Sequence, residues 1–266
     1  MRFLTTLFVA VLWITPLSAA EKVDRLMEAL RLSEVVDILT SEGKAQAHTM
    51  NETFLGNSGG EYFHTQIEDI YNPDWIHDQI SMAFLETLTD SQLDRAIVFF
   101  ESDLGQTIVS LENSARLAIQ DETIKEMAQD SYFAIDRSSQ SYRLIDEYIE
   151  VNDLIEKNVQ SSLNADYNFF RALTEDAGGD GTDLIEQLLL DKDNIERETV
   201  TWLYSFLLLA YQPLTEAQMR ENIAFSRTDT GRAMNDAFFL GFNRMYDDVY
   251  YRLGLAVSHV LSGSDL

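Results

Sequence analysis

A nine-residue stretch of the sequence, GGDGTDLIE at residues 178–186, matches a calcium-binding pattern of glycines and aspartates. In that pattern Asp180 and Asp183 supply carboxylates, and backbone carbonyls complete the oxygen shell that calcium prefers. The pattern normally works in arrays of repeated turns, whereas this chain carries one copy. The competing interpretation is a glycine-rich turn followed by a helix that Asp183 caps. The loop Asp176–Asp183 is therefore a candidate calcium site, but we assign no metal ligand from it.

Other residues that commonly carry chemistry do not form a known arrangement. The chain has no cysteine, and no two of its histidines stand one helical turn apart, as zinc-binding pairs on a helix do. These histidines are His48, His64, His77 and His259. The sequence contains neither a nucleophile elbow nor a phosphate-binding loop. We therefore assign no catalytic, cofactor-binding or metal-binding residue and expect no cofactor.

Acidic residues are so numerous that a catalytic pair among them would be hard to recognise. Asp and Glu number 45 against 19 Lys and Arg, which gives a formal net charge of −26. Asp247 and Asp248 are one such pair, and Glu112 stands one helical turn before Arg116, with which it could form an ion pair. A carboxylate-based hydrolase stays open as an alternative. The charge disfavours binding to nucleic acids and anionic membranes, and it is compatible with a solvated surface or with basic partners.

The first twenty residues have the pattern of a signal peptide. Arg2 gives a positive start, an apolar run extends from Phe3 to Ile14, and Ser18 and Ala20 are small residues before a cut. We predict cleavage between Ala20 and Glu21 and export, most simply to a periplasm. Neither this run nor any later segment is long and apolar enough to be a transmembrane helix.

The rest of the chain predicts helices and no strands. Three prolines and twelve glycines leave long uninterrupted patterns. Apolar residues recur at three- and four-residue steps from Leu93 to Ala118 and from Met234 to Val260, as on the buried side of a helix. No hairpin turn separates alternating apolar residues. The predicted fold class is all-α, a helical array.

One phrase of the sequence occurs twice. LTDSQLDRAIVFFESDLGQ at 88–106 aligns without a gap with LTEAQMRENIAFSRTDTGR at 214–232, and seven of the nineteen pairs are identical. Thr89 with Gln92, and Thr215 with Gln218, fit capping boxes, in which threonine and glutamine side chains satisfy the free N–H groups of a helix start. Each copy therefore predicts the beginning of a helix.

Each copy ends in a second cap followed by a glycine. Ser102 and Thr228 would cap the next helix, and Gly105 and Gly231 lie in its first turn, where glycine costs about 1 kcal/mol relative to alanine. A position without a side chain suggests that the preceding helix passes close by, with Phe99 or its counterpart lying across the glycine. The phrase thus predicts a corner between two helices, built twice, and contains no nucleophile or positioned base.

A fainter echo extends the repeat upstream. LRLSEVVD at 30–37 matches IEVNDLIE at 149–156 in its apolar and polar pattern at an offset of 119, while the stronger repeat has an offset of 126. Together they suggest duplication of a whole helical unit. We predict a signal peptide at 1–20, a first helical unit at 21–136 and a related second unit at 137–266.

Three segments carry a family resemblance: VFFESDLGQTIVSLENSAR, EVNDLIEKNV and SFLLLAYQPLTEAQMRENIAFSRTDTGRAMNDAFFLGFNRMYDDVYYRLG. They are similar to the exported bacterial proteins classed as domain of unknown function 2059, in particular to the duplicated versions. The resemblance spans Leu30 to Leu261, and the corner residues Phe99, Ser102, Gly105 and Gln106 carry its pattern. It implies a helical fold and export, and it brings no catalytic residues with it.

Aromatic residues interleave along several expected helices, for example in FFLGFNRMYDDVYY at 238–251. Tyr246, Tyr250 and Tyr251 cannot all face inward together, so a rim of tyrosines is compatible with a groove for a protein or peptide. Packing between helices is the competing interpretation.

We therefore expect an exported, non-enzymatic binding or scaffold protein of the cell envelope whose partner is another envelope protein or peptide. The alternatives are a calcium-responsive module centred on the Asp176–Asp183 loop and an unrecognised carboxylate-based hydrolase. The sequence leaves the oligomeric state open.

Overall fold

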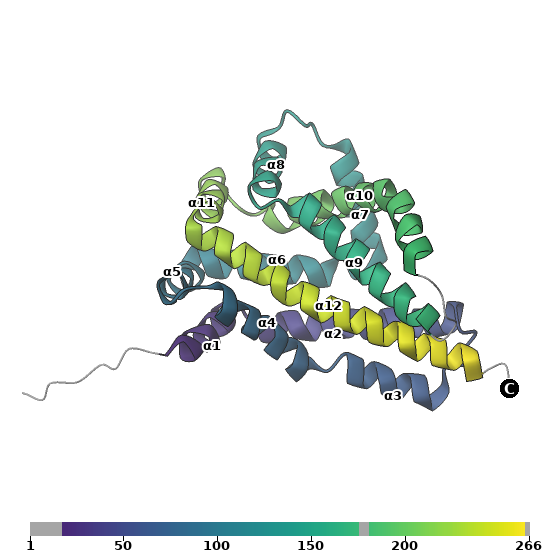
Figure 1. The fold of residues 1–266 in the computed structure, drawn as a ribbon. Coiled ribbons are helices and arrows are strands. Elements are labelled where there is room, and N and C mark those ends of the chain that lie inside the picture. Colours follow the sequence, from purple (N-terminus) through teal and green to yellow (C-terminus); the bar gives the residue numbers. More distant parts are fainter. Residues whose placement is uncertain (1–17, 176–180, 264–266) are drawn as a thin grey trace, which may run out of the picture.

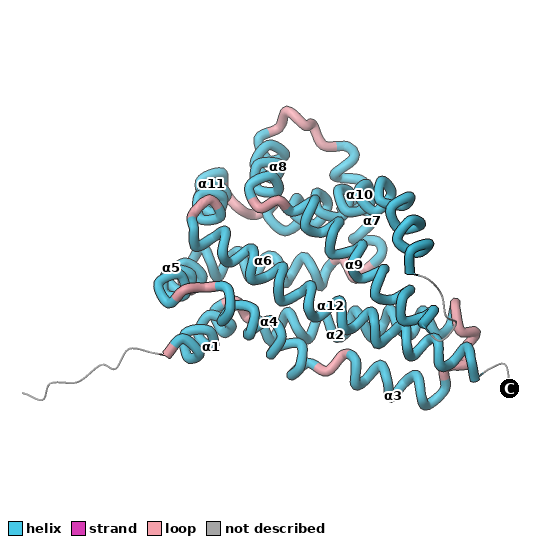
Figure 2. The backbone as a smooth tube through the Cα atoms, viewed as in Figure 1, coloured by secondary structure: helices cyan, strands magenta, loops and turns pink. Residues whose placement is uncertain are grey.

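The computed structural model describes residues 18–175 and 181–263, and within them it confirms the all-α class, because every regular element is a helix (Figures 1 and 2). The helices in chain order are α1 Ala19–Ala29, α2 Leu32–Thr53, α3 Gly60–Ile70, α4 Pro73–Thr87, α5 Asp90–Phe100, α6 Asp103–Ala118, α7 Glu122–Ala134, α8 Gln140–Val151, α9 Leu154–Thr174, α10 Gly181–Tyr211, α11 Glu216–Ser226 and α12 Asp229–Gly263. Residues 1–17 of the predicted signal peptide lie outside the described residues, and the predicted cut after Ala20 falls in the first turn of α1.

Two hydrophobic cores hold the helices together. The first is built mainly by α1 to α5 and α12, with Leu26 and Phe84 among its fully buried side chains. The second is built by α6, α7, α8, α10 and α11, with Leu203 and Ile223 among its buried side chains. The helix α9 packs along both α12 and α10.

The cores do not follow the order of the chain, because α6 and α12 are exchanged between them. The helix α6 follows the helices of the first core but buries Leu104 and Ile108 in the second. The helix α12 follows the helices of the second core but buries Met245 and Val249 in the first, and it runs the length of the molecule in Figure 1. The predicted boundary between residues 136 and 137 lies in the connection from α7 to α8. Each core therefore takes helices from both sides of that boundary.

The repeated phrase forms two corners with matching geometry. The N-cap threonines of α5 and α11 both have φ −70° and ψ 158°, and each closes a capping box with the glutamine three residues on. The side chains of Ser102 and Thr228 accept hydrogen bonds from the main-chain N–H groups of Gly105 and Gly231 at 3.1 and 2.9 Å. Both caps are those that the sequence predicts.

Each glycine of the corner makes room for the main chain of the preceding helix. A Cβ at Gly105 would overlap the carbonyl oxygen of Phe99, and one at Gly231 would overlap the carbonyl oxygen of Phe225. The expectation that Phe99 lies across the glycine is right for its carbonyl and wrong for its ring. The Phe99 ring stacks instead on the Phe225 ring, with a centroid distance of 3.8 Å and an interplanar angle of 5°. The two corners therefore pack against each other.

A second pair of matching turns joins α1 to α2 and α8 to α9. Arg31 (φ 50°, ψ 43°) and Asp153 (φ 52°, ψ 40°) are both left-handed, which is uncommon for residues other than glycine. Their separation is 153 − 31 = 122 residues, three more than the offset at which the sequence echo was aligned. An amphipathic pattern repeats every three to four residues. Aligning the two segments three residues out of register therefore leaves the match of apolar and polar positions nearly unchanged, so the pattern alone does not fix the alignment.

Two ion pairs match in position and differ in sign. The Nε of Arg25 on α1 lies 2.6 Å from Glu101 at the end of α5, and Arg227 at the end of α11 lies 2.8 Å from Glu147 on α8. The positions correspond at 147 − 25 = 122 and 227 − 101 = 126, the same offsets as the turns and corners. Each pair thus ties an equivalent pair of helices, with the charges exchanged.

Candidate functional site

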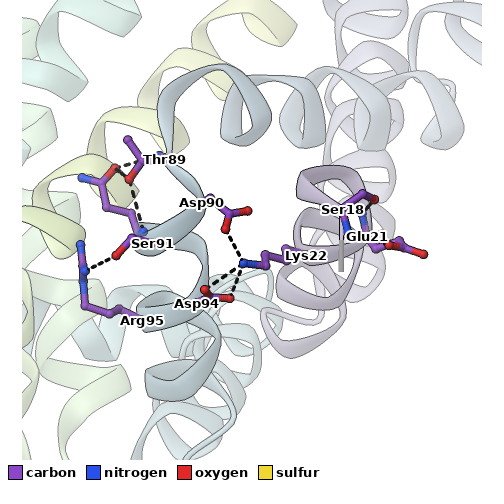
Figure 3. Close-up of polar contacts among 9 residues, drawn as sticks. Ser18, Glu21, Lys22, Thr89, Asp90, Ser91, Asp94 and Arg95 are labelled. Carbon is purple, nitrogen blue, oxygen red and sulfur yellow. Dashed lines mark hydrogen bonds and ion pairs between the residues drawn. The ribbon is translucent and has the colours of Figure 1, made fainter. Parts of the chain in front are cut away.

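Lys22 on α1 clamps that helix to Asp90 and Asp94 of the first corner, as Figure 3 shows. The Nζ of Lys22 on α1 lies 2.7 Å from carboxylate oxygens of both Asp90 and Asp94 on α5, and Lys22 is buried. On α5 itself, Arg95 donates to the hydroxyl of Ser91 at 2.6 Å and also to Thr230 of α12 at 2.7 Å. These contacts hold α1 and α12 to α5, while the side chains of Asp90 and Asp94 stay 66% and 59% exposed.

The calcium candidate Asp176–Asp183 lies largely outside the described residues, which resume at 181. Its binding of calcium stays a prediction. In the part of the chain that the structure describes, no group of three or more His, Asp or Glu side chains is arranged to hold a metal ion.

The neighbouring carboxylates of α12 turn to different partners. Asp247 accepts a hydrogen bond from Asn168 on α9 at 3.0 Å, and Asp248 lies 3.5 Å from Arg252. The two groups therefore do not face one substrate position together, as the pair of a glycosidase would.

The tyrosines of α12 serve packing between helices. Tyr246 and Tyr250 pack against the first core, while Tyr251 donates its hydroxyl hydrogen to Glu175 at 2.7 Å. The guanidinium of Arg171 lies 4.6 Å from the centre of the Tyr251 ring. The ring of His259, also on α12, lies 4.2 Å from the ring of Tyr62 between centroids, at an interplanar angle of 38°. Of the two interpretations of this aromatic run, the structure supports helix packing.

A polar cluster lies inside the second core. Tyr211 on α10 donates its hydroxyl hydrogen to the carboxyl group of Glu112 on α6. The ring of Tyr148 on α8 meets the ring of Tyr211 edge-on at 5.5 Å. Asn222 on α11 is buried, and its Nδ2 has no hydrogen-bond partner among the described residues. Four helices thus bring polar groups together in an apolar environment.

The electrostatics of this cluster favour a neutral Glu112. Burial raises the pKa of the Glu112 carboxyl, and the hydrogen bond from Tyr211 offsets this rise only in part. The expected ion pair with Arg116 does not form, because the Arg116 guanidinium lies 2.8 Å from Glu42 on α2. Glu112 and Arg116 of α6 thus find their partners on α10 and α2, which are distant in sequence. The spacing of residues within α6 could not reveal these contacts.

A stack of tyrosines ties α7 and α8 to α10. The ring of Tyr204 on α10 stacks on the rings of Tyr132 of α7 and Tyr142 of α8, with centroid distances of 5.1 and 5.3 Å. Its hydroxyl group donates to Asp146, and the guanidinium of Arg137 lies 5.8 Å from the Tyr142 ring centre. This stack fixes the inner side of α7.

The outer side of α7 carries large apolar side chains in contact with solvent. Of its residues, only Ala128 and Tyr132 are buried. Met127 and Phe133 are exposed by 64% and 68%, whereas Ile124, at 36%, stands one turn before Ala128 on the buried stripe. Sequence reasoning missed this surface. The available signal was that Phe133 directly follows a residue on the buried stripe, so the two must point in different directions.

Two open hollows lie elsewhere on the molecule. One of about 430 Å³ is lined by Arg95, Phe225 and 228–230, and another of about 440 Å³ lies beside the α1–α2 turn and His77. The Arg95 side chain in the first hollow is already engaged by Ser91 and Thr230. The exposed surface of α7 is therefore the stronger candidate for a binding site.

Comparison with known proteins identifies one region of the chain. Residues 74–131, from the first turn of α4 to near the end of α7, match a family described as "Uncharacterized protein conserved in bacteria (DUF2059)". No curated protein and no solved structure matches the chain. The family resemblance is confirmed over these residues, while the duplicated form stays a prediction. Among the described residues, no helix combines the length and apolar character needed to cross a membrane.

Proposed function

Residues 74–131 match the DUF2059 family, and we propose that the chain is a binding or scaffold protein of the bacterial cell envelope. It holds another envelope protein or peptide through α7. The observation that carries this proposal is the set of exposed apolar side chains on a helix whose other side is fixed by the tyrosine stack. Large apolar side chains on a rigid support are typical of the centres of protein interfaces.

A role without catalysis is part of the proposal. The acidic pair that the sequence offered as an example for a hydrolase is engaged in holding the fold: Asp247 with Asn168, and Asp248 with Arg252. A carboxylate hydrolase needs two acidic groups that face one cleft. These contacts support a structural use of the same groups.

Export is the second part, and it rests on the signal-peptide pattern of residues 1–20. A mature chain beginning at Glu21 would lose Ser18, which forms a capping box with Glu21, but would keep the clamp from Lys22 to α5. The mass of the protein in a periplasmic fraction tests this. We expect the mass of residues 21–266, and an unprocessed chain confined to the cytoplasm would contradict it.

The third part is that 21–136 and 137–266 are related units. Matching features of the two halves are separated by only two offsets, 122 and 126 residues. These features are the helix corners, the left-handed turns and the two ion pairs, and they support a related structure for both units.

Site-specific photo-cross-linking in living bacteria tests the binding role. A photoreactive residue in place of Met127 should give a discrete and reproducible adduct with an envelope protein. The matched control places the same residue at Val98 on α5, which is 73% exposed and lies away from α7, and should give no adduct. No adduct at 127 under several growth conditions, or identical adducts at both positions, would contradict the proposal.

A further inference from the structure

Building on that proposed function, we propose that the partner of α7 is a cationic amphipathic segment. It lies along α7 with its apolar side on Met127 and Phe133 and with its Lys or Arg side chains on the surrounding carboxylates. The helix Glu122–Ala134 has 13 residues and is therefore about 20 Å long, which matches three to four turns of a partner helix.

Exposed apolar residues lie on α7 and just before it. Of the fourteen large hydrophobic side chains that are exposed among the described residues, three belong to the 13-residue α7, and Leu117 lies near the end of α6. The three on α7 are Ile124, Met127 and Phe133. Single exposed apolar residues are ordinary, but a concentration of them on one short helix is typical of an interaction surface.

The main chain of α7 is held in place where it carries Phe133. Tyr132 is buried and stacks on Tyr204, and the ring of Phe133 contacts the ring of Tyr132 at 5.3 Å. The main chain at Phe133 is therefore fixed before a partner arrives. Binding then loses little conformational entropy on this side of the interface, which favours affinity.

The charge around these apolar residues selects the sign of the partner. On α7 the single cation, Lys125, is already paired with Glu122 at 3.1 Å. Over 122–134 this one basic residue stands against three acidic ones, Glu122, Glu126 and Asp130, which gives 1 − 3 = −2.

This charge favours a basic segment over the other possible occupants. A second copy of the chain carries the same net charge of −26, and an anionic lipid surface is also repelled. A segment with leucine-like residues on one side and lysine or arginine on the other complements both the apolar and the acidic parts of the surface.

Fluorescence anisotropy with a defined probe tests this inference. The probe is a labelled peptide of about fourteen residues made of leucine and lysine, with its leucines on one helical face. The receptor is the full mature chain. We expect saturable binding, and binding weaker by about tenfold or more for a peptide of the same composition whose leucines are spread around the helix.

Matched variants locate the binding. Met127→Ala with Phe133→Ala should weaken binding of the peptide about tenfold or more, because two apolar anchors are lost. Phe54→Ala with Val98→Ala removes two equally exposed side chains elsewhere and should leave affinity within about twofold. Glu126→Gln with Asp130→Asn should weaken binding and reduce its dependence on salt. Circular dichroism and melting curves establish that all variants fold alike.

Three outcomes would overturn the inference. If the amphipathic and the scrambled peptide bound with equal affinity, the attraction would be a diffuse effect of charge. The same would follow if the Met127/Phe133 and Phe54/Val98 double variants lost affinity equally. Self-association of the chain that is abolished by the Met127 and Phe133 pair would assign the surface to a second copy. A cross-linked partner at residue 127 without any cationic amphipathic segment would overturn this inference and leave the proposed binding function standing.

Discussion

The two hydrophobic cores bury different chemistry at corresponding positions. At the offsets of 122 and 126, the pairs are Leu26 with Tyr148, Ala96 with Asn222, and Phe238 with Glu112. The first core is apolar at these positions, whereas the second holds a carboxyl group, a phenol and an amide whose Nδ2 lacks a partner among the described residues. The same helix corners thus support both kinds of interior. The polar cluster is therefore a property of the second core and not a requirement of the fold.

The helices that follow the two corners also end differently. The helix α6 stops at Ala118, and Asp121 begins α7 by accepting hydrogen bonds from the N–H groups of Thr123 and Ile124 at 2.9 and 3.2 Å. The helix α12 continues without a break to residue 263, and Gly241 and Gly254 let it press against α4 and α9. Helices from both halves therefore cover α12, whereas α7 leaves Met127 and Phe133 exposed.

The largest expected effect concerns the corner glycines. Gly105→Ala and Gly231→Ala should each destabilise the fold by about 3 kcal/mol, because the new methyl group overlaps main-chain atoms that cannot rotate away. Denaturant unfolding measures the change. If the two corners are equivalent, the two variants should lose similar amounts of unfolding free energy.

Gly263→Ala at the end of α12 is the control, because a Cβ there meets no atom within 4 Å. It should change stability by less than about 0.5 kcal/mol. A large loss at one corner and none at the other would break the comparison between the halves.

Glu112→Gln tests the polar interior of the second core. The pKa of Glu112 is raised in the fold, so its favourable contribution is complete below the unfolded pKa and is lost as the pH rises through the folded pKa. The variant should lack this decline and should exceed the natural chain in unfolding free energy at pH 8.

Unfolding measured from pH 4 to pH 8 gives the result. Phe238→Leu, at the corresponding position of the first core, is the control and should lower stability without changing its pH dependence. Identical pH profiles for Glu112→Gln and the natural chain would show that the carboxyl group is not held neutral by the fold.

The smallest expected effect concerns the exchanged ion pairs. Reversing Arg25 and Glu101 together, to glutamate and arginine, copies the arrangement of Glu147 and Arg227. The double reversal should leave stability within about 0.5 kcal/mol, and each single reversal should cost up to about 1 kcal/mol, because the pair is partly exposed. A double-mutant cycle with no coupling between the two positions would contradict the correspondence.

The parts of the fold that the sequence predicts are those with local causes. Threonine and serine caps, the corner glycines and the apolar periodicity follow from chemistry within a few residues, and the helices begin where these signals lie. The exchange of α6 and α12 is different. An amphipathic stripe indicates that a face is buried but not which helix covers it.

The candidate site was less predictable for the same reason. Arg31 adopts a left-handed turn without the usual glycine signal, and Glu112 finds its partner on α10, far along the chain. The exposure of Met127 and Phe133 depends on the absence of a covering helix among the described residues, which no local spacing encodes.

Hydrogen exchange of the mature chain, with and without the leucine–lysine peptide, tests most directly whether α7 is the docking surface. Bound peptide should slow exchange in residues 122–134 and leave the corresponding stretch of α12, residues 248–260, unchanged. Slower exchange in 248–260, or in all surface helices alike with no preference for α7, would contradict the account.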